Sequence, residues 1–155
     1  MKNILLAAAV AAALTTTAPQ SPAADSPADQ LANVTTAMNS IPGVIFYKDI
    51  DGVYRGGNTA WASLVGRPFA ELVGKTDADL FPAELATAYR ADDQKTIDGG
   101  KPRQFKEWLV YPDGRKVYSN TLKAPWIGKD GKVLGVVGIC YEIDAPAGEK
   151  PAQDQ

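Results

Sequence analysis

Several residue types that build reactive centres are absent or nearly absent from this sequence of 155 residues. It contains no histidine, which excludes histidine-ligated haem, histidine-containing metal sites and any catalytic triad that uses an imidazole. Its single cysteine, Cys140, can form neither an internal disulfide nor a cysteine-cluster zinc site. We therefore expect no metal site in this protein.

An excess of positive charge is also missing, because 16 Lys and Arg residues stand against 18 Asp and Glu residues, for a net charge of −2. Such a chain is poorly suited to neutralise phosphates, so we expect no nucleic-acid partner. The longest apolar run, from Ile4 to Leu14, has 11 residues, whereas a membrane-spanning helix needs about 20. We expect no stable membrane span.

The two ends of the sequence differ in composition from its middle. Lys2, the apolar run and the small residues Ser21-Pro22-Ala23 are typical of a secretory signal peptide at residues 1–23, cleaved after Ala23. This predicts a periplasmic or secreted protein; the alternative is an uncleaved Ala-rich tail. Residues 145–155 contain two prolines and no apolar periodicity, which predicts a disordered tail.

A flanking N-terminal helix is predicted over residues 24–40, capped by Ser26 with Pro27 in its first turn. One face of this helix carries a narrow apolar stripe. The stripe has two interpretations: it folds back over the outer face of a sheet, or it pairs with its copy in a homodimer. Its members are Leu31, Val34, Met38 and Ile41.

The middle of the chain reads as strands, then helices, then three strands joined by hairpins. Asp51-Gly52 predicts a turn between the first two strands, at 44–48 and 53–55. Helical patterns follow over 58–66, 68–73, 76–81 and 82–97, and strands over 104–111, 116–124 and 133–143. This order predicts an α+β fold, with a five-stranded antiparallel sheet and helices packed on one face.

A series of short segments follows the same order as these elements. They are Phe46-Tyr47-Lys48-Asp49, Asp51-Gly52-Val53-Tyr54, Asn58 with Ala60, Gly66-Arg67, Gly74-Lys75-Thr76-Asp77, Asp79-Leu80-Phe81, Tyr89-Arg90 with Asp93, Glu107-Trp108, Tyr111-Pro112-Asp113-Gly114, Thr121, Lys123, Pro125, Asp130-Gly131, Gly135, Gly138 and Ile139. In this order and spacing, residues 41–144 resemble a PAS domain. The resemblance implies a PAS (profilin-like) fold whose curved sheet and helices enclose a small pocket for a ligand or cofactor. It also implies that the bound state is transmitted to a neighbouring protein.

The sequence departs from that family at the end of the last strand. Glu142-Ile143-Asp144 stands where PAS domains usually have Asp-Ile-Thr before an output helix. We therefore expect a non-enzymatic, exported sensory or ligand-binding protein that signals through a partner. The alternative is a ligand-free interaction or dimerisation module, and a third, weaker hypothesis is an enzyme that uses a pocket carboxylate, Asp77 or Asp79.

Aromatic residues and the cysteine are the candidate lining of the pocket, because a buried hydroxyl or indole N–H needs a partner that a ligand can supply. The resemblance names no cofactor. Light-sensing flavin PAS domains carry a reactive cysteine at the start of a central helix, and no cysteine lies near Asn58 to Trp61, so we do not expect flavin photochemistry. Asp77 and Asp79 are predicted to be turn and cap residues. Glu107 and Lys123 are predicted to form a surface pair; the alternative is that Lys123 faces inward and meets an anionic ligand. The candidate ligand-binding residues are Trp61, Phe81, Tyr89, Phe105, Trp108, Tyr118 and Cys140.

Overall fold

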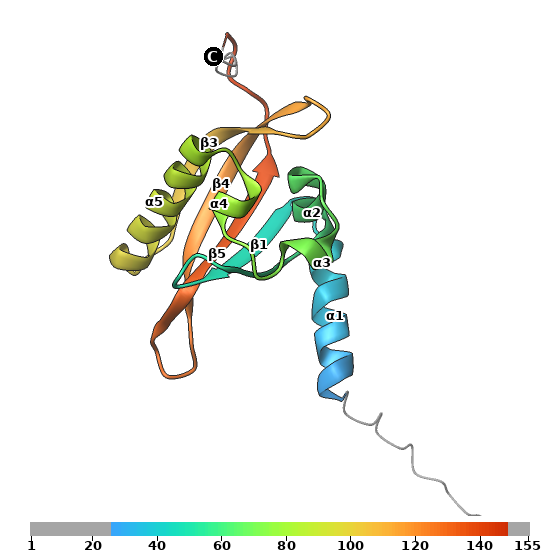
Figure 1. Cartoon of the computed structure of the whole chain (residues 1–155), viewed down its shortest axis with the longest axis vertical. Helices are drawn as coiled ribbons and strands as arrows, with labels where there is room; N and C mark the ends of the chain where they lie inside the picture. Colours follow the sequence, from blue (N-terminus) through green and yellow to red (C-terminus); the bar gives the residue numbers. More distant parts are fainter. Residues whose placement is uncertain (1–25, 149–155) are drawn as a thin grey trace, which may run out of the picture.

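A computed structural model describes residues 26–148, so the predicted signal peptide and most of the predicted tail lie outside the described residues. Five helices and five strands follow one another along this part of the chain (Figure 1). They are α1 (Pro27–Asn39), β1 (Val44–Asp49), β2 (Tyr54–Gly57), α2 (Thr59–Val65), α3 (Phe69–Leu72), α4 (Asp77–Leu80), α5 (Ala83–Gly99), β3 (Arg103–Val110), β4 (Lys116–Ile127) and β5 (Val133–Glu142).

The five strands form one antiparallel sheet in the order β2-β1-β5-β4-β3. This confirms the predicted α+β class and strand number. The first and last strands of the domain are neighbours, because Val44 of β1 pairs with Cys140 of β5. Contacts that are distant in sequence therefore close the middle of the sheet, and the residues of both strands reach the same interior.

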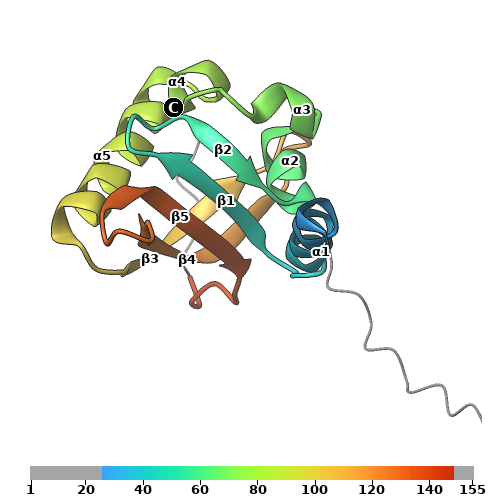
Figure 2. The ribbon, with the colours of Figure 1, turned by 90° about the horizontal axis from the view of Figure 1, so that it is seen from below.

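Helices α2 to α5 lie along one face of the sheet, as predicted (Figure 2). Side chains alternate between the two faces of a strand, so Phe46, Lys48, Thr121, Lys123 and Cys140 point toward the helices. The residues between them point to the outer face, which carries no helix across it in the described part of the chain. That outer face is apolar at Tyr47, Leu122, Ala124, Trp126, Val137 and Ile139.

Local signals set the helix ends where the sequence indicated them. Ser26 and Asp29 form a capping box at the start of α1, and Asn58 caps α2 by accepting a hydrogen bond from the Trp61 backbone N–H. Gly66 ends α2 in the left-handed conformation, at φ 73°. Only a glycine takes that conformation without strain, which explains the sharp stop.

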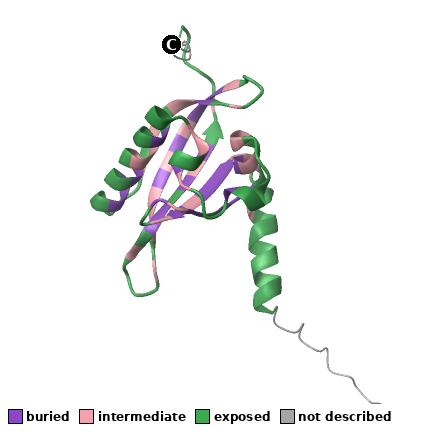
Figure 3. Ribbon diagram, in the orientation of Figure 1, coloured by how far each residue is buried: buried purple, intermediate pink, exposed green. Residues whose placement is uncertain are grey.

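Helix α1 stands apart from the rest of the domain, and none of its residues is buried (Figure 3). Leu31 and Val34 are 69% and 57% exposed, so α1 does not fold back over its own sheet. The first interpretation of the apolar stripe is therefore wrong for this structure.

Asn58 holds α1 to the domain. Its buried side chain donates to the carbonyl oxygens of Met38 and Gly43, at 3.1 and 2.7 Å. Its Oδ1 accepts from the backbone N–H groups of Ile45 and Trp61. One amide thus joins the end of α1, the start of β1 and the start of α2.

Candidate functional site

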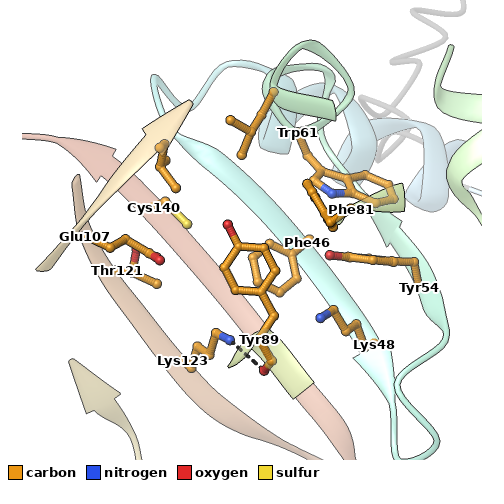
Figure 4. Close-up of a pocket in the computed structure, with 12 residues that line it drawn as sticks. Phe46, Lys48, Tyr54, Trp61, Phe81, Tyr89, Glu107, Thr121, Lys123 and Cys140 are labelled. Carbon is orange, nitrogen blue, oxygen red and sulfur yellow. Dashed lines mark hydrogen bonds between the residues drawn. The ribbon is translucent and has the colours of Figure 1, made fainter. Parts of the chain in front are cut away.

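A small cavity of about 30 Å³ lies between the sheet and helices α2 to α5 (Figure 4). This volume holds one or two water molecules, so the cavity has almost no free space for a ligand in this state. Aromatic rings surround much of it, and several charged side chains reach it from the strands. Its lining consists of Phe46, Lys48, Tyr54, Trp61, Leu64, Phe81, Tyr89, Glu107, Leu109, Thr121, Lys123 and Cys140.

The side of the cavity under α2 belongs to an apolar cluster. Within it Tyr54 packs against Phe46 and Trp61, with ring centroids 5.8 and 4.6 Å apart. The indole Nε1 of Trp61 is buried and has no hydrogen-bond partner within residues 26–148. A buried donor without a partner is costly, and such a group is a common sign of a missing ligand or water. The apolar cluster consists of Val44, Phe46, Tyr54, Trp61, Leu72, Leu109 and Cys140.

The other side of the cavity is an ionic cluster of Lys48, Asp77, Asp93 and Lys123, each at most 3% exposed. Lys48 Nζ donates to both carboxylate oxygens of Asp77, at 2.7 and 2.6 Å, and to Asp93 Oδ2 at 2.7 Å. Lys123 Nζ donates to Asp93 Oδ1 at 2.6 Å. The cluster therefore joins β1 and β4 to α4 and α5 with two positive and two negative charges.

Two predictions about these side chains are wrong. The side chain of Asp77 does not cap α4 but pairs with Lys48 and accepts a hydrogen bond from the Tyr54 hydroxyl at 2.9 Å. Lys123 is buried and pairs with Asp93 rather than forming a surface pair with Glu107. Asp79 does what was predicted: its carboxylate completes the capping box with Thr76.

Glu107 reaches the cavity from β3. Its Oε1 accepts a hydrogen bond from the Thr121 hydroxyl at 2.6 Å. No hydrogen bond to its Oε2 is found among the described residues, in contrast to the fully paired Asp77. Burial raises the pKa of Glu107 above its ordinary value, opposed by the Thr121 hydrogen bond and the positive charge of Lys123.

A second cavity of about 170 Å³ adjoins the first at the end of the sheet where β1 begins. Leu109 and Cys140 line both cavities, so these two side chains form the wall between them. Burial raises the pKa of the Cys140 thiol to about 11, which keeps it protonated and unreactive in this state.

Four of the predicted pocket residues meet at the first cavity: Trp61, Phe81, Tyr89 and Cys140. Phe105 faces the same side of the sheet but contacts Lys123 beside the cavity, with the ammonium 5.8 Å from its ring centroid.

Trp108 and Tyr118 are directly paired on β3 and β4, with ring centroids 5.1 Å apart. Trp108 lies between Glu107 and Leu109, whose side chains face the cavity, and Tyr118 is its direct partner on β4. Both side chains therefore point to the outer face of the sheet. The structure corrects their predicted place in the pocket. Aromatic character alone gave no information about which face of the strand a residue occupies.

Sequence reasoning missed the polar lining, above all Lys48, Glu107, Thr121 and Lys123. One signal was present. In the row Leu85, Tyr89, Asp93 and Ile97, at four-residue spacing on α5, the last three residues lie on the inner side of the helix, whereas Leu85 is exposed. A carboxylate at Asp93 therefore needs a buried cation. Lys48 likewise alternates with Val44 and Phe46, which are buried residues of β1.

Comparison with known proteins gives consistent matches. The family described as PAS fold matches residues 38–147. The aerobic respiration control sensor protein ArcB of Escherichia coli (strain K12) is 30% identical over 106 residues, which are 68% of this chain and 14% of ArcB. The chain thus spans about a seventh of this curated relative.

Among solved structures, the PAS domain from Bordetella pertussis BvgS matches with a TM-score of 0.63 and 21% identity, over 77% of this chain and 90% of that one. The Vibrio cholera VqmA–ligand–DNA complex matches with a TM-score of 0.65 and 25% identity, over 72% of this chain and 50% of VqmA. The ligand and the DNA belong to VqmA, half of which lies outside the match.

Proposed function

This chain belongs to the PAS fold family, and we propose that it is a non-enzymatic sensory domain that binds a small molecule in the cavity and signals through a partner protein. The observation that carries the proposal is the buried Trp61 Nε1 without a partner, at a cavity that also receives the side chains of Tyr89 and Glu107. A ligand acceptor would satisfy this donor. The similarity to a respiration sensor and to ligand-bound VqmA supports a sensory role.

The size of the cavity bears on how a ligand is held. Pockets for small molecules usually measure several hundred Å³, and about 30 Å³ is far less. Displacement of Leu109 would join this cavity to the second one of about 170 Å³. We therefore expect the ligand-bound form to differ from the present one at the wall formed by Leu109 and Cys140.

The contacts of Asp77 and Asp79 weigh against the hypothesis that either residue acts as the catalytic carboxylate of an enzyme. A general base needs a carboxylate that can accept a proton from a substrate. Both oxygens of Asp77 and both oxygens of Asp93 are held by lysine ammonium groups, and Asp79 is occupied by its capping box. These contacts make Asp77, Asp93 and Asp79 unsuitable as a general base.

Native mass spectrometry of the purified protein, before and after denaturation, tests the ligand proposal. We expect a co-purifying small molecule that is released on denaturation. A Trp61→Phe variant keeps the ring but lacks the N–H group, so it should retain less of this molecule. A protein mass without adduct, combined with no thermal shift across a metabolite panel, would contradict the proposal and favour an interaction module.

The outer face of the sheet and the stripe on α1 favour a homodimer as the form in which the domain acts. Leu31, Val34 and Val137 are all exposed apolar residues. Light scattering should give twice the chain mass, and a Leu31→Ser/Val34→Ser variant should shift it toward a monomer. Leu85→Ser on α5, a residue 40% exposed, is the matched control and should leave the mass unchanged. A monomeric wild-type protein would refute this assembly.

We further propose that the protein is exported to the periplasm or secreted, on the basis of the sequence pattern at residues 1–23. In the described part of the chain, no helix has the length and apolarity needed to cross a membrane. N-terminal sequencing of protein from fractionated cells should find Ala24 as the first residue. An intact Met1 in the cytoplasmic fraction would disprove export.

A further inference from the structure

We propose that the cavity selects an uncharged or positively charged small molecule with an N–H donor, anchored by the Glu107 carboxylate, and rejects carboxylates and other anions. This inference rests on the proposed ligand-binding function and names the chemical class of the ligand. It is not evident from the lining alone, because two lysines in a pocket would suggest an anion site.

The two lysines have little capacity left for a ligand. An ammonium group has three N–H donors, and Lys48 uses all of them on Asp77 and Asp93. Lys123 Nζ donates to Asp93 at 2.6 Å and to the Tyr89 carbonyl oxygen at 3.4 Å. An anion could bind Lys48 only by displacing a buried carboxylate, which would leave that carboxylate without its partner. At Lys123 it would meet one remaining N–H, on an ammonium group that already pairs with Asp93.

Glu107 is the remaining charge at the cavity. Asp77 and Asp93 lie behind the lining and neutralise Lys48 and Lys123, so the ionic cluster together with the ionised Glu107 has a net charge of −1. Thr121 occupies one of its oxygens, and the other has no partner among the described residues. Figure 4 shows the side chain of Glu107 extending toward the cavity. An amide or ammonium group can donate to this oxygen, whereas a second carboxylate beside it would be repelled.

The unpaired groups at the cavity are complementary to one another. Glu107 in its ionised form only accepts, the Trp61 indole only donates, and the Tyr89 hydroxyl does both. A ligand that fits all three carries a donor toward β3 and an acceptor toward α2. Compounds with an amide, lactam or amidine group meet the requirement at Glu107, and the first two also provide the acceptor.

Four groups besides the Thr121 hydroxyl bear on the charge of Glu107. Lys123 on β4 favours the ionised form, while Asp92 on α5 disfavours it. Tyr89 on α5 and Cys140 on β5 also face it, and both stay neutral because burial raises their pKa values. As the pH falls, Glu107 is protonated, so binding of a cation should weaken while binding of a neutral amide persists.

Three probes with one skeleton test the charge preference: acetamidinium, acetamide and acetate. The readout is the Trp61 indole signal in a ¹⁵N-correlated NMR spectrum, where the protein has three tryptophans and Trp61→Phe identifies the signal. At pH 7.5 we expect acetamidinium to bind at least about tenfold more tightly than acetate, equal to about 1.4 kcal/mol. Acetamide should lie closer to acetamidinium than to acetate.

The matched variant is Glu107→Gln, which keeps the shape and removes the charge. It should abolish the tenfold preference and the pH dependence of acetamidinium binding, while acetamide still binds. Asp98→Asn, an exposed carboxylate on α5, should change neither. Equal or tighter binding of acetate, an unchanged preference in Glu107→Gln, or no shift of the Trp61 signal with any probe would overturn the inference. A co-purifying anion in the native mass spectrum would overturn it too, but would leave the proposed ligand-binding function intact.

Discussion

The interior of this domain has two halves that are held together by different forces. Under α2, the apolar cluster packs aromatic and aliphatic side chains around Trp61. Under α4 and α5, the ionic cluster places four charges at positions where apolar residues are usual. The two halves touch where the Lys48 ammonium lies 4.6 Å from the centroid of the Tyr54 ring. The apolar half tolerates small changes gradually, whereas the ionic half depends on every charge keeping its partner.

Removal of one charge from the ionic cluster should have the largest effect on stability. Asp93 binds both Lys48 and Lys123, so Asp93→Asn leaves a buried positive charge without compensation. We expect a loss of about 3–5 kcal/mol in the free energy of unfolding, measured by urea denaturation. Asp98→Asn on the same helix is the exposed control and should cost less than about 0.5 kcal/mol. Equal losses in the two variants would show that the cluster does not behave as a buried ionic unit.

A cavity in the apolar half should cost less. Leu109 is 5% exposed and separates the two cavities, so Leu109→Ala should destabilise the protein by about 2–3 kcal/mol, the low part of the range for such changes. The same variant should expose Cys140, the only thiol, to alkylating reagents. Native labelling of Cys140 should be slow in the wild-type protein and clearly faster in Leu109→Ala. Val110→Ala, on the exposed side of the same strand, should alter neither quantity; unchanged labelling in Leu109→Ala would mean that Leu109 does not close the wall.

The capping box outside both clusters gives a smaller effect. Asp79 accepts hydrogen bonds from the backbone N–H and the hydroxyl of Thr76. Asp79→Ala should lower the free energy of unfolding by about 1 kcal/mol, detected as a shift of the urea midpoint. Thr76→Ser keeps the hydroxyl and should stay near wild type. A loss as large as that of Asp93→Asn would mean that Asp79 contributes to the ionic cluster and not only to the capping box.

The smallest effect should be the change in the free energy of unfolding with pH that Glu107 causes. Because its folded pKa is raised above the unfolded value, the folded state favours the protonated form. The stabilisation is complete below the unfolded pKa and is lost as the pH rises through the folded pKa. Stability of Glu107→Gln relative to wild type should therefore increase from pH 4 to pH 7.5. A flat difference over this range would mean that the carboxyl is as well solvated in the folded protein as in the unfolded one.

The same contrast explains how far the sequence could predict this structure. Strand and helix order followed from local signals such as the Asp51-Gly52 turn and the cap at Ser26, and the fold was correctly predicted. The aromatic candidates were half right, because Trp61 and Tyr89 face the cavity while Trp108 and Tyr118 face outward. The ionic cluster was missed because its partners lie 29 to 45 residues apart, and no local pattern reports which distant charge a buried Lys48 or Asp93 will meet.

The four hydrogen bonds of Asn58 have a mechanical consequence. They connect α1 and β1 to the first turn of α2, where Trp61 borders the cavity. With 13 residues, α1 is an arm of about 20 Å, so a tilt of about 10° at its anchored end moves the free end by about 3 Å. A small shift of the Trp61 ring, transmitted through Asn58, would thus produce a larger movement at Pro27, the free end of α1.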